Sequence, residues 1–146
     1  MQHIAIINGP NLNMLGKREP EMYGNLSFEQ YLLKLDALYP AITLTYYQSN
    51  IEGELINKLQ ALDEDKLCLG VVLNAGAYSH TSIAIADAVG SVAVPVISVH
   101  ISNIYAREPE RRTDLLLAHC RGSISGFGMF GYDLAIQAIC SNFDSF

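Results

Sequence analysis

Basic residues are scarce in this sequence of 146 amino acids, and they are outnumbered by acidic ones. Nine lysines and arginines stand against fifteen aspartates and glutamates, which gives a formal net charge of −6. The one cluster of arginines, Arg107, Arg111 and Arg112, is interleaved with acidic side chains. Phosphate backbones need an unopposed basic surface, so we expect no nucleic-acid partner.

Cysteine is also rare, and targeting or membrane segments are missing. Cys68, Cys120 and Cys140 are odd in number and lie in apolar contexts, which favours buried thiols over a disulfide framework or a metal site. No apolar run is long enough to cross a bilayer, and the N-terminus enters a strand-like segment with no basic n-region or cleavage site. These absences predict a soluble, cytoplasmic protein with no membrane partner.

What the sequence does contain is a regular alternation of apolar runs and helical patterns. Half of the residues are apolar, and the length suits a single domain over residues 1–146. The expected strands are residues 3–8, 42–47, 67–74, 94–101 and 122–125. The expected helices are residues 27–38 (begun by a Ser27–Gln30 capping box), 52–62, 79–89, 108 or 109–118, and 129–139.

Five such β-α units predict a parallel sheet that is covered by helices on both faces. For a chain of this size we expect an α/β, flavodoxin-like three-layer fold with five parallel strands in the order 2-1-3-4-5. The first, third and fourth strands would then be neighbours. Open α/β sheets bind their ligands at the carboxyl ends of the strands, so residues there deserve the closest inspection.

Polar side chains gather at these predicted strand ends, with few carboxylates among them. The candidates are Asn8, Asn11, Asn74, Gly76, His80, Asp87, His100, Ile101, Ser102, Arg107 and Arg111. Taken singly, each has an ordinary structural explanation, such as a turn, a helix cap or a solvated charge. Their coincidence at one edge of the sheet points instead to a site for an anionic, hydroxyl-rich small molecule.

The loop after the first strand adds a base and a cation between two glycines, Gly16 and Gly24. The reference pKa of tyrosine is about 10, so Tyr23 could serve as a base only if a nearby cation, Arg18 or Arg107, favours its ionised form. His100 could donate a proton to a leaving hydroxyl. Asn11 could position a water against a developing enolate. With Asn74 and the backbone N–H groups of Ile101 and Ser102 available to bind a carboxylate, this set suits proton abstraction next to a carbonyl with loss of water.

Several long motifs, in order along nearly the whole chain, resemble those of one family, the type II 3-dehydroquinate dehydratases. They are Asn8-Gly9-Pro10-Asn11-Leu12, Leu15-Gly16-Lys17-Arg18-Glu19-Pro20 with Tyr23-Gly24, Gln48-Ser49-Asn50-Ile51-Glu52-Gly53, Asn74-Ala75-Gly76 with His80-Thr81-Ser82, Val99-His100-Ile101-Ser102-Asn103, and Gly126 to Tyr132. The resemblance implies a cofactor-free anti elimination that converts 3-dehydroquinate into 3-dehydroshikimate through an enolate, in the biosynthesis of aromatics or the catabolism of quinate.

The resemblance also implies a role for each candidate. Tyr23 matches the proton acceptor, Arg18 the arginine that supports its ionised form, His100 the proton donor and Asn11 the residue that orients water. The matches to substrate-binding positions are Asn74, Ile101 and Ser102 for the carboxylate, His80, Asp87 and Arg111 for the ring hydroxyls, and Arg107 as a second cation near the tyrosine. Family members assemble trimers into dodecamers, with the Asp87 position reaching a neighbour's site.

Two segments depart from the family's pattern. Ser98 stands where many members have a glutamate that orients the histidine, and Thr113-Asp114 replaces His-Ser after the arginine pair. Since a serine at position 98 brings no charge, we expect His100 to be less basic or to be held through water, and Asp114 to pair with Arg111 or Arg112 and weaken substrate binding. The departures leave open an alternative, a catalytically impaired paralogue that acts as a small-molecule binding or regulatory module. A phosphate-accepting receiver domain is disfavoured, because Asn8 and Asn74 stand where it needs acidic residues.

Overall fold

The computed structural model describes residues 1–17 and 25–143. Two of the predicted catalytic residues, Arg18 and Tyr23, therefore lie outside the described residues.

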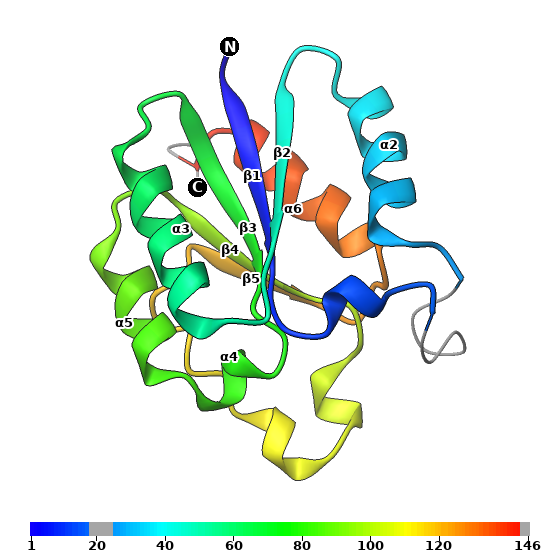
Figure 1. The fold of residues 1–146 in the computed structure, drawn as a ribbon, viewed down its shortest axis with the longest axis vertical. Helices are drawn as coiled ribbons and strands as arrows, with labels where there is room; N and C mark the ends of the chain where they lie inside the picture. Colours follow the sequence, from blue (N-terminus) through cyan, green and yellow to red (C-terminus); the bar gives the residue numbers. More distant parts are fainter. Residues whose placement is uncertain (18–24, 144–146) are drawn as a thin grey trace.

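The described chain is built on a five-stranded, wholly parallel sheet (Figure 1). The strands are β1 (His3–Asn8), β2 (Thr43–Gln48), β3 (Cys68–Asn74), β4 (Val96–His100) and β5 (Gly122–Ser125). Their order is β2-β1-β3-β4-β5, which confirms the predicted topology. In the register between β1 and β3, Asn8 lies opposite Asn74, so two asparagines end neighbouring strands at the same level.

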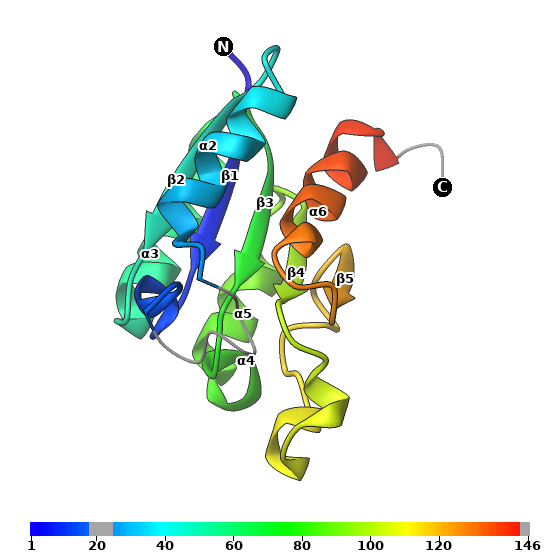
Figure 2. The same cartoon turned by 90° about the vertical axis from the view of Figure 1, so that its right-hand side faces the viewer.

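Helices cover both faces of the sheet, as Figure 1 and Figure 2 show. The helices are α2 (Phe28–Leu38), α3 (Glu52–Glu64), α4 (Tyr78–Thr81), α5 (Ile83–Ser91) and α6 (Phe130–Cys140), and the short 3-10 turns are η1 (Leu12–Met14), η2 (Ile104–Ala106) and η3 (Pro109–Arg112). One buried cluster joins the sheet to α2 and α6 through Phe28 and Tyr132. The other joins it to α3 and α5 through Leu55 and Ile85. Each side of the sheet thus has its own apolar layer.

The predicted capping box at the start of α2 is confirmed. The Ser27 hydroxyl accepts from the backbone N–H of Gln30 at 3.2 Å, and the Gln30 side chain accepts from the backbone N–H of Ser27 at 3.0 Å. Two N–H groups that the helix itself leaves unpaired are satisfied in this way.

The single helix predicted over residues 79–89 is divided into α4 and α5. The break falls at Ser82, whose backbone is extended (φ −97°, ψ 99°) and whose hydroxyl accepts from the N–H of Ile85 at 2.9 Å. Ser82 is therefore the N-cap of a new helix. The turn α4 carries His80 toward the carboxyl edge of the sheet before α5 begins.

The prediction of a helix from residue 108 or 109 to residue 118 is wrong. The structure has only η3 there, followed by an extended Thr113 (φ −98°, ψ 124°) and a series of turns. The Asp114 carboxylate accepts from the N–H of Leu116 at 2.9 Å, and aspartate side chains that bond the nearby backbone compete with helix formation. The sequence pattern predicts a helix, but the Asp114 side chain bonds to the backbone of Leu116 instead.

The cysteines are free thiols, as expected, but they are not all buried. Cys68 and Cys120 are half-buried, and Cys140 is exposed at the end of α6. In the part of the chain that the structure describes, no helix combines the length and apolar character that crossing a membrane requires.

Candidate active site

A cavity of about 130 Å³ opens at the carboxyl ends of β1, β3 and β4. Its walls come from the loop after β1, the β3–α4 turn, the end of β4 and the η2–η3 segment. The lining residues are Pro10, Asn11, Leu12, Met14, Leu15, Asn74, Gly76, Ala77, His80, His100, Ile101, Ser102, Ile104, Arg107 and Arg111. Two arginines and two histidines face amides and apolar groups, and this described wall contains no aspartate or glutamate. Such a wall favours an anionic ligand.

Asn74 is positioned at the end of β3 by a fully buried tyrosine. The Asn74 side-chain amide donates to the hydroxyl of Tyr132 at 2.9 Å, and that hydroxyl donates to the side-chain carbonyl of Asn8 at 2.7 Å. Burial raises the pKa of Tyr132 far above its usual range, so the hydroxyl remains a donor to Asn8. The other end of the Asn74 amide, its oxygen, accepts from the N–H of Gly76 at 3.1 Å. Asn74 is therefore held at both ends of its side chain.

Gly76 makes the turn between β3 and α4. Its φ of +59° lies in the left-handed region, where glycine is favoured. A Cβ at this position would meet the backbone oxygen of Pro10 at 3.2 Å. The Ser79 hydroxyl, which lies within α4, donates to the Gly76 carbonyl at 2.6 Å. This turn brings the β3–α4 and β1–η1 loops close together on one side of the cavity.

Asn11 also has a left-handed backbone, with a φ of 69°, a conformation that asparagine tolerates better than most residues. Its backbone N–H donates to the side-chain oxygen of Asn50 at 3.0 Å. The Gln48 side chain donates to that same oxygen at 3.1 Å and to the carbonyl of Gly9 at 3.1 Å. The end of β2 thus supports the loop that places Asn11 at the cavity.

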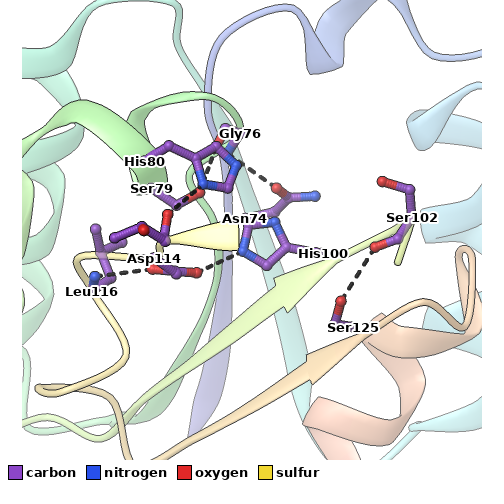
Figure 3. Close-up of polar contacts among 10 residues, drawn as sticks. Asn74, Gly76, Ser79, His80, His100, Ser102, Asp114, Leu116 and Ser125 are labelled. Atoms are coloured by element: carbon purple, nitrogen blue, oxygen red, sulfur yellow. Dashed lines mark hydrogen bonds and ion pairs between the residues drawn. The ribbon is translucent and has the colours of Figure 1, made fainter. Parts of the chain in front are cut away.

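His100, the last residue of β4, has a carboxylate partner. Its Nε2 atom lies 2.7 Å from Oδ2 of Asp114, and the two side chains are only 8% and 1% exposed. Figure 3 shows the imidazole between Asp114 on one side and Asn74 on the other. His100 is therefore held directly by a carboxylate and not through water, and the expectation that Asp114 pairs with Arg111 or Arg112 is wrong. The reason is the extended Thr113, which turns Asp114 inward.

His80 is held by the residue next to Asp114. Its Nδ1 atom lies 2.7 Å from the backbone oxygen of Thr113, and a carbonyl accepts but cannot donate. Nδ1 of His80 therefore carries a proton. The His80 and His100 rings are stacked, with 5.8 Å between their centroids and 18° between their planes. The consecutive residues Thr113 and Asp114 thus orient a pair of stacked histidines on the cavity wall.

The arginines of the wall are also anchored. Arg107 donates to the Ser102 hydroxyl at 3.3 Å. The Nε–H of Arg111 donates to the Glu108 carboxylate at 2.5 Å, and this contact lowers the pKa of Glu108. Both arginines lie on the segment after β4, so their positions depend on how the η2 and η3 turns fold.

Most of the predicted site residues lie together in this cavity. Its wall includes Asn11, Asn74, Gly76, His80, His100, Ile101, Ser102, Arg107 and Arg111. Asp87 is exposed on α5 and does not belong to the lining residues. The resemblance assigned its side chain to a neighbouring subunit's site, so its role stays a prediction. The roles of Arg18 and Tyr23, outside the described residues, stay predictions too.

Sequence reasoning missed the supporting roles of two residues. Tyr132 appeared only as part of a motif, and Asp114 as a partner for an arginine. The absence of a carboxylate two residues before His100, at Ser98, was a usable signal that another element had to supply one.

The family model for the class II dehydroquinases matches residues 2–140. The chain belongs to this family. Among its relatives is a 3-dehydroquinate dehydratase of an Exiguobacterium species, 50% identical over 138 residues, which cover 93% of this chain and 92% of the relative. One from Clostridium botulinum is 45% identical over 144 residues, 97% of each chain. A type II dehydroquinase from Butyrivibrio crossotus has the same fold, with a TM-score of 0.90, 41% identity, and coverage of 95% of this chain and 97% of that one.

As a class II dehydroquinase the chain is a hydro-lyase, and the cavity agrees with that chemistry. A lyase that expels water needs a proton donor at the leaving hydroxyl. His100 is the one imidazole of the described wall that is paired with a carboxylate.

Proposed function

We propose that this protein dehydrates 3-dehydroquinate to 3-dehydroshikimate by an anti elimination through an enolate, without a cofactor. Relatives named 3-dehydroquinate dehydratase at 50% and 45% identity over nearly the full chain support the substrate. The observation that carries the proposal is the wall of the cavity, which joins two arginines, two histidines and two asparagines without an acidic side chain among its described residues. That wall suits a small carboxylate rich in hydroxyls.

Tyr23 and His100 share the proton transfers in this proposal. Ionised Tyr23 takes a proton from the carbon next to the carbonyl, and Arg18 favours the ionised form of Tyr23. The electron pair moves onto the carbonyl oxygen to form an enolate, which faces a water oriented by Asn11. The enolate collapses, the β-hydroxyl leaves, and His100 donates the proton that makes it water.

The remaining residues hold the substrate. Asn74 binds the carboxylate together with the backbone N–H groups of Ile101 and Ser102. The ring hydroxyls are bound by His80 and Arg111, and Arg107 adds a second cation near Tyr23. Each of these groups belongs to the described wall except Tyr23.

We further propose that the chain assembles trimers into a dodecamer in the cytoplasm. Asp87 lies exposed on α5, where a side chain is accessible to a neighbouring subunit. In such an assembly it would complete that subunit's site. The same reaction fits either of two roles, the biosynthesis of aromatics or the catabolism of quinate.

The test is to mix the purified protein with 3-dehydroquinate, with no added metal or cofactor, and to follow the ultraviolet absorbance of the conjugated enone. A rise that persists after treatment with borohydride supports the enolate route, because a Schiff-base intermediate would be trapped as an amine. Tight binding of the substrate with no rise would contradict the proposal and favour a binding module built on the same scaffold.

A further inference from the structure

We propose that Asp114 is the residue that orients His100 for proton transfer, in place of a carboxylate on β4. This inference rests on the proposed function, because it takes His100 to be the proton donor. It assigns a positioning role to a residue outside the cavity wall, which would act on the substrate through the imidazole alone.

The contact between the two side chains determines how the imidazole carries its protons. Oδ2 of Asp114 lies 2.7 Å from Nε2 of His100. A carboxylate accepts hydrogen bonds and does not donate them, so Nε2 carries a proton. The position that exchanges a proton with the substrate is then Nδ1, on the side of the ring where Figure 3 shows Asn74 of the cavity wall. Because Nε2 keeps its proton on Asp114, His100 donates from Nδ1 as the doubly protonated imidazolium and returns to the neutral Nε2–H ring afterwards. A single contact thus fixes which nitrogen faces Asp114 and the direction of the ring.

Asp114 is itself held firmly enough to orient a neighbour. Its second oxygen, Oδ1, accepts from the backbone N–H of Leu116 at 2.9 Å. Leu116 is fully buried in the apolar cluster beneath α3 and α5. With 1% of its side chain exposed, the carboxylate is shielded from competing water, and the backbone that carries it is anchored in the core.

Residue 98 on β4 is a serine, so the carboxylate that contacts His100 comes instead from Asp114 on a loop. Side chains alternate along a strand, so Ser98 and His100 share the face of β4 that Val96 places in the α3–α5 cluster. A serine there brings no charge to the imidazole. The two departures of this chain from the family's pattern, at residues 98 and 114, are therefore complementary: a carboxylate is missing on the strand and one is present on the loop.

The first experiment compares Asp114→Asn with the wild-type enzyme and with Glu110→Gln, which removes the same charge from the exposed η3 turn nearby. Removing a group that orients a reacting imidazole commonly slows turnover by about 10- to 100-fold. We expect that loss in kcat for Asp114→Asn with KM almost unchanged, because Asp114 does not belong to the described wall of the cavity. Glu110→Gln should keep wild-type kcat. Equal kcat in all three proteins would overturn the inference.

A second variant asks whether the carboxylate is what matters. Ser98→Glu introduced into Asp114→Asn should recover much of the lost kcat, since it returns a carboxylate beside His100 on the same face of β4. Ser98→Glu alone should bring no gain, because the position beside Nε2 is already occupied. A folded double variant as slow as Asp114→Asn would count against the inference.

A measurement on the unmodified protein covers the case in which these variants do not fold. In ¹⁵N-histidine NMR spectra of the wild type, assigned with His100→Gln, Nε2 of His100 should carry a hydrogen-bonded proton in both the neutral and the doubly protonated ring. A neutral His100 with its proton on Nδ1 and none on Nε2 would contradict the inference. Absence of turnover in the wild type would instead count against the proposed function, so the two failures are distinguishable.

Discussion

The hydroxyl of Tyr132 accepts a hydrogen bond of 2.9 Å from the side-chain amide of Asn74 at the carboxyl end of β3. It also donates to Asn8 at 2.7 Å, so one buried phenol joins the ends of two neighbouring strands. Tyr132 lies on α6, which packs on the opposite face of the sheet from the stacked histidines. The position of Asn74 therefore depends on the packing of the last helix.

Tyr132→Phe should weaken both stability and substrate binding. Two buried asparagine groups would each lose a partner, and an unsatisfied buried polar group costs about 1–3 kcal/mol. We expect a lower free energy of unfolding in urea and a higher KM, with Tyr105→Phe, on an exposed ring, as the control. A Tyr132→Phe enzyme with unchanged KM would show that Asn74 keeps its position without the phenol.

Gly76→Ala should distort the cavity, whereas Gly53→Ala should be harmless. At Gly76 the left-handed φ disfavours any Cβ by roughly 1–2 kcal/mol. At Gly53, the second residue of α3, an added Cβ meets no atom within 4 Å, so alanine should cause no loss of stability. Thermal unfolding and KM, measured on both variants, test the contrast. A Gly76→Ala protein as stable as Gly53→Ala would refute it.

The three thiols should differ in their reactivity toward a disulfide reagent at pH 8. Burial raises the pKa of Cys120 to about 12, with a further contribution from the charge of Asp114. Since the thiolate is the nucleophile, Cys120 should react slowly until the protein unfolds. Cys140 is exposed and should react first, although partial burial also raises its pKa. The fast phase should disappear in Cys140→Ser; a fast phase that persists would identify another thiol as the most accessible.

Tyr23→Phe should abolish turnover while the protein keeps its fold and much of its affinity for substrate. A positioned base contributes about 10²- to 10⁴-fold to a proton transfer, and phenylalanine retains the ring without the ionisable oxygen. Activity measured by enone absorbance, beside calorimetric binding of the substrate, separates the two effects. Full activity in Tyr23→Phe would remove this residue as the base.

Much of the site was predictable because parallel strands end at a common edge. The residues at the carboxyl ends of β1, β3 and β4, such as Asn74 and His100, had to meet once the strand order was correct. The local turn at Gly76 was equally accessible, since a glycine after a strand end signals a left-handed turn. Apolar periodicity gave wrong helix predictions at Ser82 and Asp114, where a side chain accepts a hydrogen bond from the nearby backbone and so competes with a continuous helix.

The sequence alone determined the fold class, the strand order and the family, because apolar periodicity and long motifs are local properties. Only the tertiary structure decided which charges are paired. Asp114 lies three residues after Arg111 in the sequence, yet its partner is His100 at 2.7 Å, and Arg111 pairs with Glu108. Such a choice depends on the backbone conformation of one residue, Thr113, and on burial that only the packed chain provides.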